Sequence, residues 1–326
     1  MKLLIFLSVL MFSLFISSML TGPSVIGNAD SLKALIFDDG GPVTVIMREI
    51  RLPRAILAIM IGISLGLSGA AMQGYLRNPL AEPGLIGVSG AAGLGAVLAL
   101  QTGIAASFSL ALPLFALIMA LIAVGLILVL AGPRGSSFSL ILAGIAISAL
   151  ASALTSLVLN LSPNPFAASE IVFWMLGSLS DRSFNHVWIA LPFTLVGWIL
   201  LTIIGRSLDA LTLGEDAAQS MGVNLLRTRL FLVIGTAASV GASTAVAGAI
   251  GFVGLVVPHI LRPFVGARPS ALLFSSAIGG ATMVLAADIA TRIIRPEQDL
   301  KLGVLMALVG APFFLHLIYK SRAERL

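Results

Sequence analysis

Few acidic or basic residues in this chain are placed to do chemistry, and two of them lie in the stretch "AADIATR". Asp288 and Arg292 stand four residues apart with the acid first, so on a helix they share one face and can form an ion pair. An acid in a long apolar segment is a candidate for proton or ion chemistry. Because Asp288 lies near the end of its segment, we interpret it as a residue that orients Arg292.

Other residue patterns that support catalysis or metal binding are missing from the sequence. There is no cysteine, and the three histidines, His186, His259 and His316, are far apart without ligand spacing. The sequence has no H-E-x-x-H motif, and none of its lysines lies in a G-x-x-x-x-G-K-[ST] loop that would bind ATP phosphates. We therefore expect no metal, no cofactor bound by this chain, no catalytic residue and no ATP hydrolysis.

The composition is that of a membrane protein. Of the 326 residues, 58% are hydrophobic and 10% are charged, and the mean hydropathy is +1.09, so a water-soluble fold could not bury the apolar surface. No polar or Pro/Gly-rich linker divides the chain, which predicts a single transmembrane domain over residues 1–326. The formal charge of +5 suits basic loops beside an anionic lipid bilayer, and we expect no nucleic-acid partner.

Nine apolar segments predict membrane-spanning helices, for which roughly 20 residues suffice. A tenth, shorter span is predicted in "GFVGLVVPHIL", where Pro258 and three nearby glycines would interrupt a helix. The apolar run after Lys2 could be a signal peptide, but "TGPS" is not a typical cleavage site, so we interpret it as a retained first helix. The other expected spans cover residues 54–75, 88–102, 107–131, 139–161, 186–205, 229–249, 271–291 and 301–319.

Ten spans place both termini on one side, and the basic C-terminal "YKSRAERL" puts that side in the cytoplasm. Gly62, Gly66 and Gly69 form a small-residue stripe that predicts close helix packing in lipid. The stretches "GLIGV" (84–88) and "GFVGL" (251–255) share a glycine pattern, and the helices before them run in opposite directions. The shared pattern and the opposite helix directions indicate an inverted repeat, which is a common architecture among transporters.

Several blocks of the sequence closely resemble one known family. "RLPRAILAIMIGISLGLSGAAMQGYLRNPLAEPGLIGVSG", "FWMLGSLS", "LTLGEDAAQSMGV", "AGAIGFVGLVVPHILR" and "AADIATR" occur in the order found in the FecCD family, the permeases of ATP-driven importers for iron-siderophores, haem and cobalamin. The resemblance runs from about residue 51 to residue 312. It implies an all-α integral membrane protein with about ten transmembrane helices, an inverted internal repeat and the type II ABC importer permease architecture.

The resemblance also implies partners and a location. The permease would form a homodimer or pair with a second permease, in the bacterial inner membrane. It would bind two cytoplasmic ATPase subunits, which hold ATP and Mg²⁺, and would receive its substrate from a periplasmic or extracellular binding protein. As substrate, an iron chelate such as a siderophore or haem is expected ahead of cobalamin.

Residues 206–228 form the longest polar connection on the predicted cytoplasmic side. In "LGEDAAQSMGV", Glu215 and Asp216 favour a helix N-terminus and Gly222 favours a helix end, so the residues alone predict a short helix in a solvated loop. By resemblance, this segment couples the permease to the ATPase. The residues expected to do so are Leu213, Gly214, Glu215, Asp216, Ala217, Ala218 and Gly222.

The loop "RNPLAEPGLIG" connects an inward helix to an outward one. Its prolines and glycines predict a rigid turn, and this interpretation is favoured for Pro79, Glu82 and Pro83. By resemblance, the loop narrows the transport pathway at its cytoplasmic mouth, with a second constriction in "RGSSFSL". The residues expected at this gate are Asn78, Leu80, Ser136 and Ser137.

Arginines gather on the side opposite to the termini. Arg51 and Arg54 in "RLPR" begin the second helix there, and Arg292 ends a later one. Arginines at helix ends often only extend to lipid headgroups, and Asp288 can neutralise Arg292. In the family, arginines at these motif positions contact acidic residues of the binding protein, a pairing that suits the guanidinium fork. The resemblance therefore predicts docking by Arg51, Arg54 and Arg292.

Two other classes of function fit a chain with many spans. An ion-coupled secondary transporter of a small solute needs a relay of buried acids or histidines, and an intramembrane enzyme needs a catalytic cluster. Within the long apolar spans, almost no ionisable side chain occurs besides Asp288. The sequence therefore favours the permease of an ATP-driven importer over both alternatives.

Overall fold

The computed structural model describes residues 2–22, 26–37, 40–108, 110–132, 137–162, 165–294 and 300–323. Every regular element in these ranges is a helix. Seven helices are long and apolar enough to cross a bilayer, and three shorter apolar helices bring the described number to ten. The ten are α1 (Lys2–Leu20), α4 (Leu52–Leu76), α5 (Val88–Gln101), α7 (Ala111–Ala131), α8 (Ser137–Asn160), α10 (Phe184–Ile203), α13 (Leu225–Ala247), α14 (Val253–Leu261), α15 (Pro269–Ile294) and α16 (Leu302–Ala323). The expected all-α architecture with about ten spans is confirmed.

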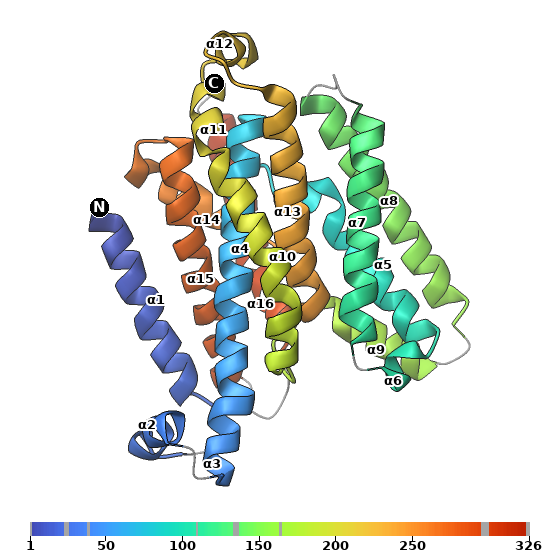
Figure 1. Ribbon diagram of the computed structural model, residues 1–326, viewed down its shortest axis with the longest axis vertical. Coiled ribbons are helices and arrows are strands. Elements are labelled where there is room, and N and C mark those ends of the chain that lie inside the picture. Colours follow the sequence, from blue (N-terminus) through green and yellow to red (C-terminus); the bar gives the residue numbers. More distant parts are fainter. Residues whose placement is uncertain are drawn as a thin grey trace.

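Shorter elements connect the spans and gather at the two ends of the molecule (Figure 1). The second span begins earlier than the sequence predicts, because a helical turn and a π-helical turn continue into α4 without a break from Pro42 onward. The end that carries α11 and α12 lies opposite the end that carries α2 and α3. These connecting elements are α2 (Asn28–Ile36), α3 (Pro42–Val45), η1 (Ile46–Arg51), η2 (Pro83–Ile86), α6 (Ile104–Ser107), α9 (Pro165–Met175), α11 (Gly205–Leu211), α12 (Glu215–Ser220) and η3 (Arg262–Val265).

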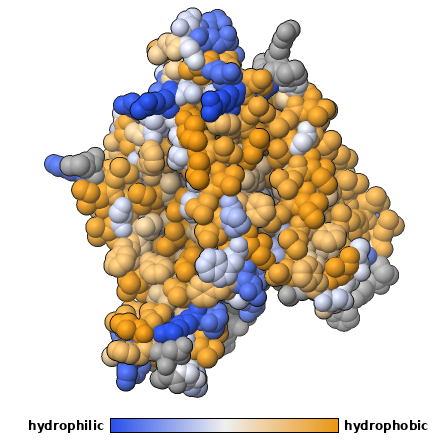
Figure 2. Space-filling model, viewed as in Figure 1, coloured by the Kyte–Doolittle hydropathy of each residue, from blue (hydrophilic) through white to orange (hydrophobic). Residues whose placement is uncertain are grey.

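The molecular surface carries a broad hydrophobic belt between hydrophilic ends (Figure 2). Large apolar side chains on α7, α8 and α10, among them Ile118, Leu142 and Ile199, point outward in this belt. A water-soluble monomer rarely exposes so continuous an apolar surface. The chain is therefore a multi-pass membrane protein.

Helix α4 lies at the centre of the bundle, and it packs most extensively against α15. The two helices approach backbone to backbone, because a Cβ atom on Gly66 would collide with the carbonyl oxygen of Ser276, and one on Gly280 would collide with that of Gly62. A Cβ atom on Gly69 would meet the carbonyl oxygen of Gly254 in α14. The predicted small-residue stripe is thus confirmed as the contact surface of α4.

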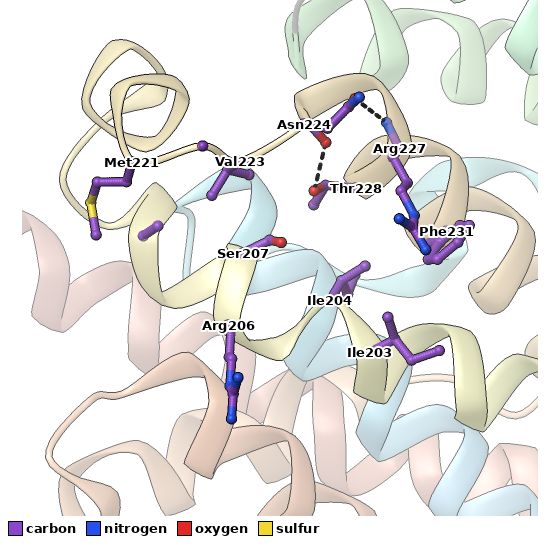
Figure 3. Close-up of a pocket in the computed structure, with 12 residues that line it drawn as sticks. Ile203, Ile204, Arg206, Ser207, Met221, Val223, Asn224, Arg227, Thr228 and Phe231 are labelled. Atoms are coloured by element: carbon purple, nitrogen blue, oxygen red, sulfur yellow. Dashed lines mark hydrogen bonds between the residues drawn. The ribbon is translucent and has the colours of Figure 1, made fainter.

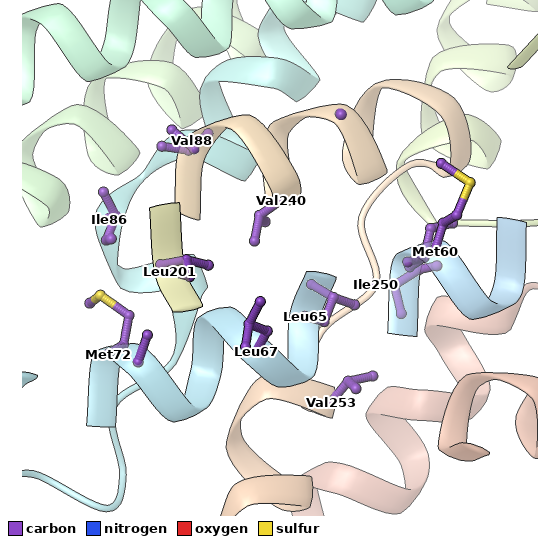
Figure 4. Packing of buried hydrophobic residues seen from close by; sticks show 14 of the residues in the cluster. Met60, Leu65, Leu67, Met72, Ile86, Val88, Leu201, Val240, Ile250 and Val253 are labelled. Carbon is purple, nitrogen blue, oxygen red and sulfur yellow. The ribbon is translucent and has the colours of Figure 1, made fainter. Parts of the chain in front are cut away.

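On its other faces, α4 contributes bulky side chains to the core (Figure 4). Leu65, Leu67 and Met72 of α4 are buried together with Leu201 of α10 and Val240 of α13. Small residues let α4 approach α15 and α14 backbone to backbone, and large ones pack against α10 and α13.

The tenth span is interrupted in its glycine-containing stretch, as the sequence predicts, but not at Pro258. The chain leaves the helical path between α13 and α14, where Gly248 and Phe252 take positive φ values of +74° and +66°. Pro258, which the sequence analysis expected to interrupt the helix, lies inside α14. It is tolerated there because α14 begins only five residues earlier and its interior receives a hydrogen bond from another helix, described below.

We predict that Gly66→Ala destabilises the protein, because its Cβ would press on the α15 backbone. Gly125→Ala, in α7, is the matched control, since that Cβ would enter open space. Overpacking of this kind costs about 1–3 kcal/mol, whereas alanine in an exposed helix position is neutral or gains up to about 1 kcal/mol. Denaturant unfolding in detergent micelles measures both. Equal stability of the two variants would contradict the backbone contact.

Candidate functional site

An ion-pair network joins α4 and α15 at the end of the molecule that lies opposite α12. The buried carboxylate of Asp288 accepts hydrogen bonds from Arg54 through Oδ1 (2.9 Å to Nε) and from Arg292 through Oδ2 (2.8 Å to Nη2). The predicted pairing of Asp288 with Arg292 on one helix face is confirmed. The partnership with Arg54 crosses 234 residues of sequence, so no local spacing could reveal it.

The same arginines hold the C-terminal end of α1. Nη1 of Arg51 donates to the carbonyl oxygens of Met19 (2.9 Å) and Leu20 (3.2 Å), and Arg292 donates to the carbonyl oxygen (2.9 Å) and the hydroxyl (2.6 Å) of Ser18. The last carbonyls of a helix have no partner within the helix and carry partial negative charge. Two guanidinium groups therefore cap α1 and fasten it to the α4–α15 pair.

The three arginines expected at a docking surface thus lie close together, but they differ in exposure. Arg51 is only 4% exposed, and Arg292 is also turned inward, whereas the side chain of Arg54 keeps 17% of its surface exposed. Three guanidinium groups against the single carboxylate of Asp288 leave a net charge of +2 among these four residues. The cluster is therefore both a structural fastening and a positive region.

The two stretches that share a glycine pattern in the sequence lie next to each other in the structure. Residues 84–88 lead into the short helix α5, and residues 251–255 lead into the short helix α14. Oε1 of Glu82 accepts a hydrogen bond from the backbone N–H of Phe252 (2.7 Å), which caps the N-terminus of α14 with a carboxylate. A cavity of about 140 Å³ lies between the two stretches, with Glu82 in its wall.

Gln73 is a connecting residue that the sequence analysis missed. Because Pro258 has no backbone N–H, the carbonyl oxygen of Gly254 lacks its helical donor. Nε2 of Gln73 reaches this oxygen from α4 (3.4 Å), while its Oε1 accepts from Arg262 (2.6 Å). Gln73 is buried and thereby joins α4 to both ends of α14. The proline in α14 is the sequence signal that could have indicated such a donor.

Two of the four residues expected at the cytoplasmic gate, Asn78 and Leu80, lie just beyond the end of α4, at the same end of the molecule as α11. Asn78 is exposed, and its Oδ1 accepts from the backbone N–H of Leu80 (2.9 Å), which closes a tight turn. Leu80 is half-buried against an apolar cluster that includes Leu255 and Leu317. Ser136 lies outside the described residues. Ser137 is the first residue of α8.

The expected short helix is present as α12, and it ends before Gly222 as predicted. Gly214 precedes it with a φ of +106°, and Gly222 follows it with a φ of +87°. Behind the helix, the N–H of Gly222 donates to Gln219 (2.8 Å) and the N–H of Val223 donates to Ala218 (3.0 Å). This is the paired bonding of a Schellman motif, which ends a helix at a glycine.

The surface of the α11–α12 segment differs from the expected one at a single residue. Ala218 is buried under the segment, so it supports α12 from inside and offers no contact surface. Leu213 and Met221, at the two ends of α12, are instead 68% and 65% exposed. The apolar side chains available at the surface of this segment are therefore those at the two ends of α12.

Asp209 fastens α11 to the start of α15. Its carboxylate accepts from the backbone N–H (2.8 Å) and the hydroxyl (2.6 Å) of Ser270, and from Nε of Arg268 (2.9 Å). Burial alone would raise the pKa of Asp209, but the hydrogen bonds from Ser270 and Arg268 outweigh it and lower that pKa. The carboxylate is therefore ionised at neutral pH and caps the positive N-terminus of α15.

Comparison with known proteins identifies the family. The sequence model of the FecCD transport family matches residues 9–320. The chain belongs to the FecCD transport family. It is 40% identical over 288 residues to the uncharacterized ABC transporter permease protein YvrB of Bacillus subtilis, and the aligned region covers 86% of this chain and 81% of YvrB. It is 38% identical over 277 residues to the vitamin B12 import system permease protein BtuC of Klebsiella pneumoniae, and the aligned region covers 85% of this chain and 83% of BtuC.

A solved structure supports the same conclusion for the whole chain. The inward-facing conformation of a metal-chelate type ABC transporter superposes with a TM-score of 0.85 at 30% sequence identity, covering 98% of this FecCD chain and 99% of the other. This FecCD protein is a permease subunit of an ABC importer, as the sequence predicts. Its curated relatives are permease subunits and not enzymes.

We predict that Asp288→Asn destabilises this FecCD permease, because Arg54 and Arg292 would lose their buried counter-charge. Removing one partner of a buried ion pair costs about 3–5 kcal/mol. The matched control is Asp181→Asn, an exposed acid whose positive φ of +56° suits asparagine. Denaturant unfolding in micelles is the measurement, with proteolysis of α1 as a second readout. Unchanged stability in Asp288→Asn would contradict the fastening role.

Proposed function

We propose that this permease moves a metal chelate or cobalamin into the cytoplasm, driven by ATP. The observation that carries the proposal is membership of the FecCD family over nearly the whole chain. BtuC belongs to a vitamin B12 import system, and the solved structure belongs to a metal-chelate type transporter. An iron chelate, whether a siderophore complex or haem, is the first candidate substrate and cobalamin is the second.

In this proposal the chain works as one part of a larger assembly. It pairs with a second permease, in the simplest case another copy of itself, and binds two ATPase subunits and an external substrate-binding protein. ATP and Mg²⁺ are bound by the ATPase, because this sequence has no P-loop, and the permease itself holds no cofactor. The assembly lies in the bacterial inner membrane, with both termini in the cytoplasm according to the positive-inside rule.

The ATPase contacts the segment from 206 to 228. Leu213 and Met221 supply apolar anchors, and the acids Glu215 and Asp216 supply charge at the start of α12. The buried Ala218 and the bounding glycines keep the short helix in place. Because Asp209 links this segment to α15, a displacement of the segment reaches the transmembrane core directly.

The gate and the docking surface lie at opposite ends of the pathway. At the cytoplasmic mouth, Asn78 and Leu80 narrow the opening from one loop, and Ser136 and Ser137 narrow it from the other. At the external end, Arg54 is the arginine best placed to meet acidic residues of the binding protein, because it is the most exposed of the three. Arg51 and Arg292 would contribute through the positive potential that they add.

We expect ATP-dependent uptake when the permease is reconstituted in proteoliposomes with its ATPase and binding protein. A ferric siderophore, haem and cobalamin are the substrates to compare, and accumulation is measured with ATP supplied on the ATPase side. Vesicles whose ATPase lacks the P-loop lysine are the control and should take up nothing above leakage. Uptake that follows a proton or sodium gradient without ATP would contradict the proposal and favour a secondary transporter.

We expect the double variant Leu213→Glu with Met221→Glu to lose ATPase binding while remaining folded. Hot-spot residues are worth about 2 kcal/mol, which corresponds to about a 30-fold weaker affinity. Phe37→Glu, an equally exposed apolar residue at the opposite end, is the control and should bind normally. Affinity for the purified ATPase is the measurement. Normal affinity in the double variant would remove α12 from the interface.

A further inference from the structure

Two hollows open on either side of Arg206, where α10 passes into α11. The first, of about 440 Å³, lies between α11 and the start of α13, and Arg206 and Arg227 line it from different helices. Figure 3 shows that the side chain of Arg206 points away from Arg227, toward the side on which the second hollow lies. The second, of about 420 Å³, lies between α11 and α15 and contains Arg206 and Arg268. Both volumes fall within the range of about 300–1,000 Å³ that is usual for ligand pockets.

The charged side chains that line the two hollows are all arginines. Arg206 and Arg227 are exposed, and none of the described residues that line either hollow is acidic. The guanidinium of Arg227 stacks over the ring of Phe231 at 5.0 Å, which fixes its direction. Arg268 is shared with Asp209, but the rest of its side chain remains exposed. The hollows therefore attract an anion.

The hollows also border the apolar belt. Ile203 lines both of them and is more than half exposed, as is Ile199 one turn earlier on α10. Phe274 of α15 lines the second hollow and is likewise more than half exposed. An occupant would thus place a negative group among arginines and an apolar tail along these three side chains. That combination belongs to an anionic phospholipid.

We propose that the two hollows beside Arg206 bind the headgroups of anionic phospholipids, with the acyl chains lying over Ile199, Ile203 and Phe274. Basic pockets between transmembrane helices are typical sites for such headgroups. Met221 and Val223, at the end of α12, line the first hollow, so a bound headgroup contacts the segment proposed to receive the ATPase. Lipid binding itself does not depend on that function or on the transported substrate.

The test compares retention of phosphatidylglycerol and phosphatidylcholine by the purified full-length permease, measured by native mass spectrometry from mixed micelles. Wild type should retain phosphatidylglycerol preferentially. The double variant Arg206→Gln with Arg227→Gln should lose that preference, by about fivefold in affinity for each arginine, since a basic residue near an anionic surface contributes about 1 kcal/mol. Each single variant should lose part of it, which guards against a folding defect in the double variant.

Two further measurements decide whether phosphatidylglycerol binds specifically in the hollows or is attracted to any exposed basic residue. Arg77→Gln is the matched control, because Arg77 is an exposed arginine at the same end of the molecule that lines neither hollow. It should retain phosphatidylglycerol as wild type does, and an equal loss in Arg77→Gln would overturn the proposal. So would the absence of any preference in wild type, or displacement of the lipid by inorganic phosphate at equal concentration, which would show that the hollows bind free phosphate.

Discussion

The backbone contact between α4 and α15 is the constraint on which the rest of the structure depends. In a bilayer, helices gain little from excluding lipid, so close approach through small residues provides much of the packing energy. Gly62, Gly66 and Gly280 allow that approach, and they leave no room for a side chain between the helices. The pair then carries Asp288 and Arg54 at one end and Ser270 at the other, so both polar fastenings are positioned by one helix contact.

Next to α4 and α15, the irregular backbone at α14 receives hydrogen bonds from side chains of other elements. Non-helical backbone at membrane depth is stable only when protein satisfies its polar groups. Glu82 receives the N–H of Phe252, and Gln73 donates to the carbonyl of Gly254 that Pro258 leaves free. Both side chains come from the first half of the chain and stabilise the start of α14 in the second half, so this break depends on contacts between the two halves.

Hydropathy and local spacing were enough to predict the ten helices, the Asp288–Arg292 pair and the short helix α12 that ends before Gly222. Each of these depends on residues within one or two helical turns of each other. The contact of Glu82 with Phe252 spans 170 residues and that of Arg51 with Met19 spans 32, so both depend on how distant helices align. The same reason explains why Ala218 was expected at the surface: alanine spacing gives no sign of which face the neighbouring α11 covers.

The arginines illustrate how one residue type takes different roles according to the helix end beside it. Arg51 and Arg292 lie next to the C-terminal carbonyls of α1, whose partial negative charge holds them inside the fold. Arg206 and Arg227 lie where α11 and α13 begin, and a helix N-terminus carries partial positive charge and leaves its own N–H groups pointing outward. Neither guanidinium is held by the C-terminal carbonyls of a distant helix as Arg51 and Arg292 are, and both side chains remain exposed. The fastening arginines are therefore distinguished by the helix end that they reach in space, and not by their position within their own helix.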